Sequence, residues 1–137
     1  TPAQGRWQAW SPGAVAQAQA QGRPVFVDFT AAWCVTCQLN KRTTLSDPDV
    51  LADFERRQVV LLRADWTRRD PAITQELARL GRSGVPVYAL YSPTARGPLV
   101  LPEILRAQDL HQALAGVADV FAVAVADDVD VRLESAH

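Results

Sequence analysis

Two cysteines three residues apart are the side chains of this sequence whose type and spacing best support chemistry. They form the segment Cys34-Val35-Thr36-Cys37, and the chain has no other cysteine. Residues at this spacing lie one turn apart on the same face of a helix, close enough to form a disulfide. The pattern places Cys34 at a helix N-terminus, where unpaired N–H groups and the helix dipole stabilise a thiolate, and Cys37 one turn inside. We expect Cys34 to attack a partner disulfide and Cys37 to resolve the mixed disulfide.

Two other uses of a cysteine pair compete with this interpretation. A metal site would need two further ligands, and the two histidines, His111 and His137, lie far away in the sequence. An inert structural disulfide is the second alternative. Redox chemistry is favoured over both because the pair stands between a predicted strand and a predicted helix.

Asp28 is a charged residue inside the most apolar predicted strand, residues 25–29. An ionised carboxylate is costly to bury, so we expect the pKa of Asp28 to be raised. Asp28 shares a strand face with Phe26, and the loop returns the next helix over that strand. A carboxyl group under Cys37 could then take or give the proton of that thiol. The alternative is an aspartate hydrogen-bonded to loop backbone.

Three aromatic residues and one proline complete the candidates. Trp33 precedes Cys34 and either packs over the helix start or forms part of a docking surface. We assign Trp66 and Tyr88 to core or rim packing. Pro86 begins a predicted strand, and the sequence alone predicts a trans peptide bond there, because only about 5–6% of X–Pro bonds are cis.

The elements that must position these residues follow from apolar patterning and helix start signals. The first eleven residues are polar, with Trp7 and Trp10 spaced to pack or pair at a sheet edge. The predicted helices cover residues 14–21 after Ser11-Pro12, 34 to about 45, 47 to about 57, 71 to about 80, and 107 to 117 with a possible continuation to Ala126. The predicted strands cover residues 25–29, 59–65, 85–91 and 99–101.

This order of elements predicts an α/β fold. Strands separated by helices indicate right-handed parallel crossovers, and only the last two strands should form an antiparallel hairpin. The expected architecture is a small mixed sheet with helices on both faces. We expect one domain over residues 1–126, with its core at about 10–117, and an acidic tail at 127–137.

Composition excludes several classes of protein. The chain has 137 residues, of which 48% are hydrophobic and 21% charged, as in a globular domain. Fourteen basic against fifteen acidic residues give a net charge of −1, so the sequence lacks the excess of positive charge that is typical of nucleic-acid-binding proteins. Two cysteines are too few for a disulfide framework, a four-cysteine zinc site or most iron–sulfur clusters.

The sequence shows no targeting segment. Its longest apolar stretch, residues 120–126, is shorter than a membrane-spanning helix requires. The chain begins at Thr1 and contains no methionine, so we expect a mature fragment or an excised domain. We also expect this fragment to be monomeric and not to insert into a membrane itself.

The segment around the cysteines resembles the active-site segment of thioredoxin-fold proteins. Residues 25–37 read VFVDFTAAWCVTC. More narrowly, the chain resembles the C-terminal periplasmic domain of DsbD-type thiol:disulfide interchange proteins, including the ScsB-type reductases. The similarity covers roughly residues 10–117 and includes the segments Leu45-Ser46-Asp47-Pro48, Ala64-Asp65-Trp66-Thr67 and Gly84-Val85-Pro86-Val87-Tyr88.

This resemblance implies a thioredoxin-like fold and roles that spacing alone does not give. Pro86 would be a cis-proline facing the disulfide, Val85 would offer backbone hydrogen bonds to a docked partner, and Asp28 would match the buried acid. The redox group would be the Cys34–Cys37 disulfide, with no metal or organic cofactor.

The resemblance also implies a place for the domain in a chain of electron carriers. In the family, such a domain takes electrons from a membrane-embedded domain of the same polypeptide. It passes them to another periplasmic domain and finally to oxidised substrate proteins. We therefore expect a periplasmic protein-disulfide reductase, tethered to the inner membrane in the full-length protein.

One position departs from the pattern of the family. Relatives often carry an acidic residue seven positions after the first cysteine, where this chain has Lys41. Two helical turns place Lys41 on the face that bears the cysteines. An ammonium group there favours a thiolate, so we expect Cys34 to be more acidic than in relatives with the acid. The alternative is a lysine that extends into solvent.

Two rival functions use the same cysteine pair. A free-standing oxidase or isomerase would differ from a reductase only in redox potential. A Cu(I)-binding module would hold the metal between the two thiolates. The absence of methionine and of nearby histidine weakens the copper interpretation.

Overall fold

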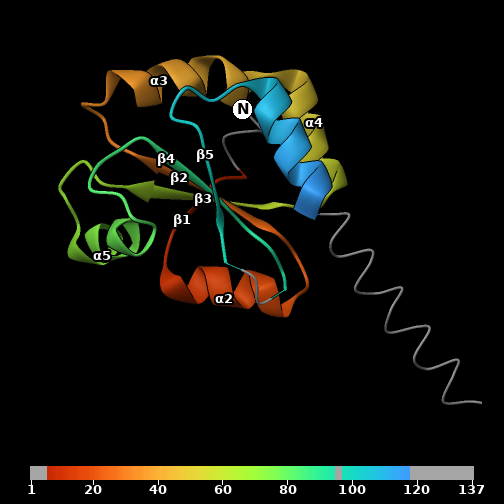
Figure 1. Ribbon diagram of the computed structural model, residues 1–137, viewed down its shortest axis with the longest axis horizontal. Coiled ribbons are helices and arrows are strands. Elements are labelled where there is room, and N and C mark those ends of the chain that lie inside the picture. Colours follow the sequence, from red (N-terminus) through yellow and green to blue (C-terminus); the bar gives the residue numbers. More distant parts are fainter. Residues whose placement is uncertain (1–5, 95–96, 118–137) are drawn as a thin grey trace, which may run out of the picture.

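The computed structural model describes residues 6–94 and 97–117, and they form a five-stranded mixed sheet with helices on both faces (Figure 1). The strands are β1 (Gln8–Ala9), β2 (Val25–Thr30), β3 (Val60–Asp65), β4 (Val87–Tyr91) and β5 (Leu99–Leu101). The helices are α2 (Pro12–Ala20), α3 (Val35–Arg42), the 3₁₀ helix η1 (Thr44–Ser46), α4 (Pro48–Arg56), α5 (Pro71–Arg79) and a helix over residues 107–117. The strand order is β1-β3-β2-β4-β5.

The central strand β2 separates two apolar layers. All six of its residues are buried, and alternate side chains face opposite sides of the sheet. Val25, Val27 and Phe29 pack with residues of α2 and α5. Phe26 packs on the other side with α4 and the helix over residues 107–117, where α3 also lies. Asp28, two residues from Phe26, therefore faces the side of the sheet that α3 and α4 cover.

Helix starts follow the predicted capping signals. The side chains of Ser11, Asp47 and Asp70 accept backbone N–H bonds at the starts of α2, α4 and α5, and a proline follows each of them. Such caps satisfy donors that have no partner within the helix.

The predicted helix from Cys34 to about Leu45 is too long. α3 ends at Arg42, and the backbone leaves helical geometry at Thr43, where ψ is −92°. The Thr43 hydroxyl donates to the carbonyl oxygen of Leu39, and the Thr44 hydroxyl donates to that of Leu105. The bond from Thr44 leads away from α3 to a distant segment, which suits a helix that ends before it.

The predicted direction of β4 is wrong. β2 and β3 are parallel, but β4 is antiparallel to β2, with Val87 opposite Phe29 and Tyr91 opposite Val25. The segment that contains α5 lies beside the end at which β3 finishes (Figure 1). β4 therefore begins at the same end of the sheet at which β3 finishes, and no parallel crossover forms. The predicted hairpin of β4 with β5 is confirmed.

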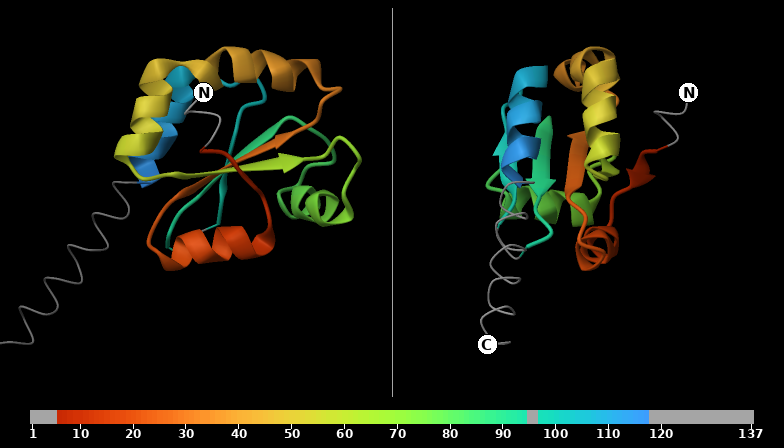
Figure 2. Two further views of the ribbon diagram at one scale, coloured as in Figure 1. Left: turned by 180° about the vertical axis from the view of Figure 1, so that it is seen from behind. Right: turned by 90° about the vertical axis from the view of Figure 1, so that its right-hand side faces the viewer.

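The ends of the described chain pack against the sheet. β1 pairs with the outer side of β3, and Trp7 and Trp10 on either side of it contact Phe26 and Phe29. The two views in Figure 2 place the helix over residues 107–117 beside α4. Its possible continuation to Ala126 and the tail at 127–137 lie outside the described residues. Within residues 6–94 and 97–117, no helix is both long and apolar enough to cross a membrane.

Candidate active site

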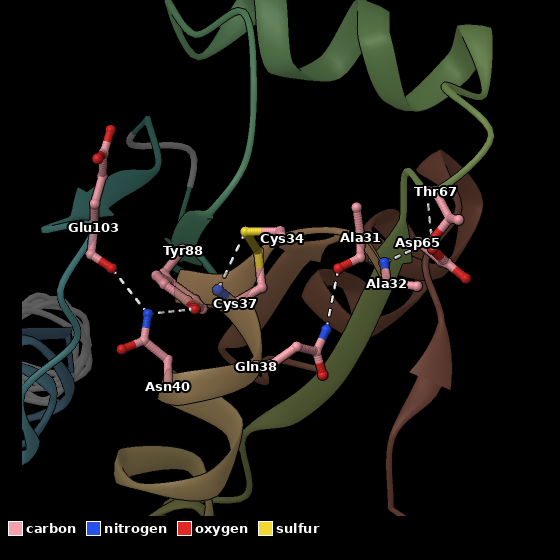
Figure 3. The surroundings of a disulfide bond; sticks show 10 residues. All are labelled: Ala31, Ala32, Cys34, Cys37, Gln38, Asn40, Asp65, Thr67, Tyr88 and Glu103. Carbon is pink, nitrogen blue, oxygen red and sulfur yellow. Dashed lines mark hydrogen bonds between the residues drawn. A yellow bond between two sulfur atoms is a disulfide. The ribbon is translucent and has the colours of Figure 1, made fainter.

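Cys34 and Cys37 form a disulfide where β2 passes into α3 (Figure 3). Their Cα atoms are 5.2 Å apart. Cys34 is the N-cap of α3, and its sulfur accepts the backbone N–H of Cys37 at 3.1 Å. Cys37 is fully buried, whereas Cys34 keeps 7% of its surface exposed. The predicted position of Cys34 at the helix start is confirmed, and Cys34 is the more accessible residue of the pair.

The loop before Cys34 is fixed by the carboxyl end of β3. The backbone N–H of Ala32 donates to the Thr67 hydroxyl at 2.9 Å, and Thr67 in turn donates to the Asp65 carboxylate. On the helix side, the Gln38 amide donates to the carbonyl oxygen of Ala31 at 3.1 Å (Figure 3). Hydrogen bonds from two elements therefore hold the segment that carries the disulfide.

The Val85–Pro86 peptide bond is cis. This finding agrees with the resemblance and corrects the trans bond expected from the sequence alone. The trans preference of an X–Pro bond is only about 0.5–1 kcal/mol, so tertiary contacts decide the isomer. Val85 packs against the buried cluster of Ala31, Cys34 and Cys37, which places the segment before β4 next to the disulfide.

Asp28 is fully buried, and its carboxylate accepts the Arg63 Nε–H at 3.1 Å. Burial raises the pKa of Asp28, while the positive charges of Arg63 and Lys41 oppose the rise. The predicted direction of the pKa is confirmed. The partner, however, is a side chain of the neighbouring strand and not loop backbone. Sequence reasoning missed Arg63, although a charged residue within the apolar strand 59–65 was a signal.

Lys41 is half-buried near the end of α3. It lines an open pocket of about 350 Å³ at the carboxyl ends of β2 and β3, together with Thr30, Ala31, Ala32, Gln38, Arg63, Asp65 and Thr67. Burial lowers the pKa of Lys41, and the nearby carboxylates of Asp28 and Asp65 act against this decrease. The ammonium group therefore belongs to the electrostatic surroundings of the buried acid.

Trp33 stands at the rim of the site, and Trp66 lies beneath it. Trp33 is 50% exposed, its Nε1–H donates to the carbonyl oxygen of Thr67 at 3.1 Å, and its ring centroid lies 6.0 Å from that of Trp66. Trp66 is buried, and its Nε1–H donates to Thr74. The assignments of Trp66 and Tyr88 to packing are confirmed, since Tyr88 is also fully buried.

Asn40 is a buried polar residue that sequence reasoning did not single out. Its side-chain amide donates to the Tyr88 hydroxyl at 2.7 Å and to the carbonyl oxygen of Glu103 at 2.9 Å (Figure 3). Its side-chain oxygen accepts the N–H of Leu105. Asn40 therefore links α3 to β4 and to the segment before the last described helix. A polar residue on an amphipathic helix gives no such signal in the sequence.

The described residues contain no group of three or more histidine, cysteine or acidic side chains that could hold a metal ion. His111 contacts the Asp53 carboxylate at 2.7 Å, and His137 lies outside the described residues.

Comparison with known proteins identifies the family. A family model described as thioredoxin-like matches residues 6–93. The chain belongs to the thioredoxin-like family. With a disulfide at the start of α3, it is a protein-disulfide oxidoreductase, and the predicted thioredoxin-like fold is confirmed.

Several curated relatives are thiol:disulfide interchange proteins. DsbD 1 of Pseudomonas aeruginosa is 35% identical over 94 residues, which cover 65% of this chain and 16% of the relative. DsbD of Ralstonia nicotianae is 50% identical over 54 residues, which cover 39% of this chain and 9% of the relative. The chain thus matches less than a fifth of the length of either protein.

Solved structures agree with this fold. A thioredoxin from Thermus thermophilus superposes with a TM-score of 0.66 at 28% identity, covering 82% of this chain and 86% of that one. The C-terminal domain of DsbD from Neisseria meningitidis in its reduced form gives a TM-score of 0.63 at 20% identity, covering 80% and 98% of the two chains.

Proposed function

We propose that this thioredoxin-like chain is a protein-disulfide reductase domain that relays electrons through Cys34 and Cys37. The electrons would come from a membrane-embedded domain and pass to periplasmic partner proteins, as in a DsbD-type interchange protein. The observation that carries the proposal is the cysteine pair at the start of α3 in a chain related to DsbD. Residues 1–126 would form the single domain, with 127–137 as a tail.

The proposed reaction transfers two electrons and two protons to the partner. The Cys34 thiolate attacks one sulfur of the partner disulfide, the partner S–S bond breaks, and the released sulfur takes up a proton. The Cys37 thiol then loses its proton and attacks the Cys34 sulfur. The mixed disulfide breaks, the second partner sulfur leaves as a thiolate and takes up a proton, and the Cys34–Cys37 disulfide forms.

Four further residues are assigned roles in this proposal. Asp28 accepts the proton of Cys37. Burial raises the pKa of Asp28, which makes its carboxylate a stronger proton acceptor. Trp33, Val85 and Pro86 contact the docked partner. Support for the last three roles comes from the exposure of Trp33 and from the packing of Val85 against the disulfide.

The reduction potential of the Cys34–Cys37 couple tests the direction of electron flow. We expect a value near or below about −220 mV, the range of thioredoxins and glutaredoxins, in equilibrium with a thiol buffer of known potential. A value near about −120 mV would identify an oxidant and contradict the reductase assignment.

Lys41→Glu is expected to raise the pKa of the Cys34 thiol. The ammonium group lies near Asp28 and Asp65. Helical spacing places Lys41 on the face that bears the cysteines, and a carboxylate there would oppose the thiolate. The rate of alkylation of the reduced protein, followed against pH, measures this pKa. Arg42→Glu is the matched control, because Arg42 is exposed on the same helix and the change in charge is the same. An equal effect of both variants, or none from Lys41→Glu, would refute the proposed role.

A further inference from the structure

The exposed indole beside Cys34 is held from both sides. Trp66 supports one side of Trp33, and the Thr67 carbonyl oxygen accepts its Nε1–H. On top of the two rings lies the guanidinium group of Arg69, with its central carbon 5.3 Å from the Trp33 centroid and 4.9 Å from the Trp66 centroid. Both distances are within the range of favourable cation–π contacts.

Arg69 stands in a tight turn between Trp66 and α5. Arg69 has a φ of 55°, in the left-handed region that favours glycine. Its N–H donates to the carbonyl oxygen of Trp66 at 2.9 Å, and the next residue, Asp70, caps α5. An exposed arginine at such a position is free to extend into water, yet here its guanidinium group lies over both tryptophans.

We propose that Arg69 is a positioning residue for partner docking. Its guanidinium group fixes the Trp33 indole against Trp66, so that a protein disulfide approaching Cys34 meets an ordered aromatic surface. A side chain ordered in advance loses less entropy on binding. Arg69 acts through Trp33 and not on the sulfur atoms. This inference rests on the proposed function, because it assumes that protein disulfides dock over Cys34.

Arg69→Gly removes the guanidinium group without straining the loop, since glycine adopts a positive φ readily. Arg68→Ala is the matched control, because Arg68 is the adjacent exposed arginine and its loss changes the net charge equally. Arg69→Lys retains the charge but loses the planar group that stacks on aromatic rings, so it should restore the wild-type behaviour only in part.

The three variants are compared with wild type in the reduction of insulin, with dithiothreitol as the source of electrons. For Arg69→Gly we expect the KM for insulin to rise about three- to tenfold, with kcat unchanged. The rate constant of the reduced protein with a small aromatic disulfide should stay at the wild-type value. Relaxation of the Trp33 indole N–H resonance should show greater mobility in Arg69→Gly and not in Arg68→Ala.

Three outcomes would overturn the proposal. The KM of Arg69→Gly could equal that of Arg68→Ala, the indole could remain as ordered as in wild type, or the small disulfide could react more slowly in proportion to insulin. The proposed function fails separately if wild-type protein reacts with the small disulfide but does not reduce insulin, and the docking role falls with it.

Discussion

The Cys37→Ser variant is expected to stop turnover and to remain covalently bound to its partner. Cys34, at the edge of the site, can still attack a partner disulfide, but no second thiol is present to break the mixed disulfide. We expect turnover to fall by at least about 10³-fold, comparable to the loss of one member of a covalent catalytic unit in other enzymes. A mixed disulfide that dithiothreitol cleaves should accumulate with one partner per chain.

Cys34→Ser separates the two roles. Because Cys37 is fully buried and Cys34 keeps part of its surface exposed, this variant should neither turn over nor form the adduct. Intact mass measurement after mixing each reduced variant with excess insulin distinguishes the two results. Thr36→Ser is the control, since it introduces a serine between the cysteines without removing a sulfur. Accumulation of adduct on Cys34→Ser and not on Cys37→Ser would reverse the assigned order of attack.

Local signals in the sequence were sufficient to locate the disulfide and its scaffold. Ser11, Asp47 and Asp70 accept hydrogen bonds at helix starts because a short polar side chain before a proline suits that position. The same locality explains Cys34, whose sulfur takes the place of a capping oxygen at the start of α3. The apolar run at 25–29, interrupted only by Asp28, similarly indicated a strand buried on both faces, as β2 is.

Features that depend on distant segments could not be read from the sequence. The direction of β4 depends on where the chain returns to the sheet, and the helical pattern of α5 does not determine this. Arg63, the partner of Asp28, is 35 residues away, and the partners of Asn40 are 48 to 65 residues away. Tertiary contacts likewise determine the isomer of the Val85–Pro86 bond. Each of these cases depends on how separate segments pack together, which a pattern within one segment does not contain.

Asp53 is expected to be among the most costly single residues to replace for stability. It is only 3% exposed on α4, and its carboxylate contacts Arg56 at 2.6 Å, Arg57 at 2.8 Å and His111 Nδ1 at 2.7 Å. The contact with His111 connects α4 to the helix over residues 107–117, which lies beside it (Figure 2). Replacing the carboxylate with an amide removes one acceptor oxygen and the negative charge, so at least one of these partners loses its acceptor.

The pKa of Asp53 sets the pH at which this stabilisation acts. Burial alone would raise the pKa, but hydrogen bonds from His111, Arg57 and Arg56 outweigh it and lower the pKa from 3.8 to about 2. A carboxylate with a lowered folded-state pKa stabilises the fold fully above its unfolded pKa of 3.8, and the stabilisation is lost as pH falls toward 2. A difference of this size corresponds to about 2 kcal/mol.

Asp53→Asn should therefore lower the free energy of unfolding by about 2–3 kcal/mol near neutral pH. The difference from wild type should shrink steadily between about pH 4 and about pH 2, because the wild-type carboxyl is then protonated as well. Urea denaturation across this range measures it, with Asp49→Asn as the control, since Asp49 is an exposed acid on the same helix. If the difference stays constant down to about pH 2, Asp53→Asn destabilises the fold through the shape of the amide and not through the loss of charge.

His111→Ala should lower the free energy of unfolding less than Asp53→Asn does, because the two arginines still contact the carboxylate after that change.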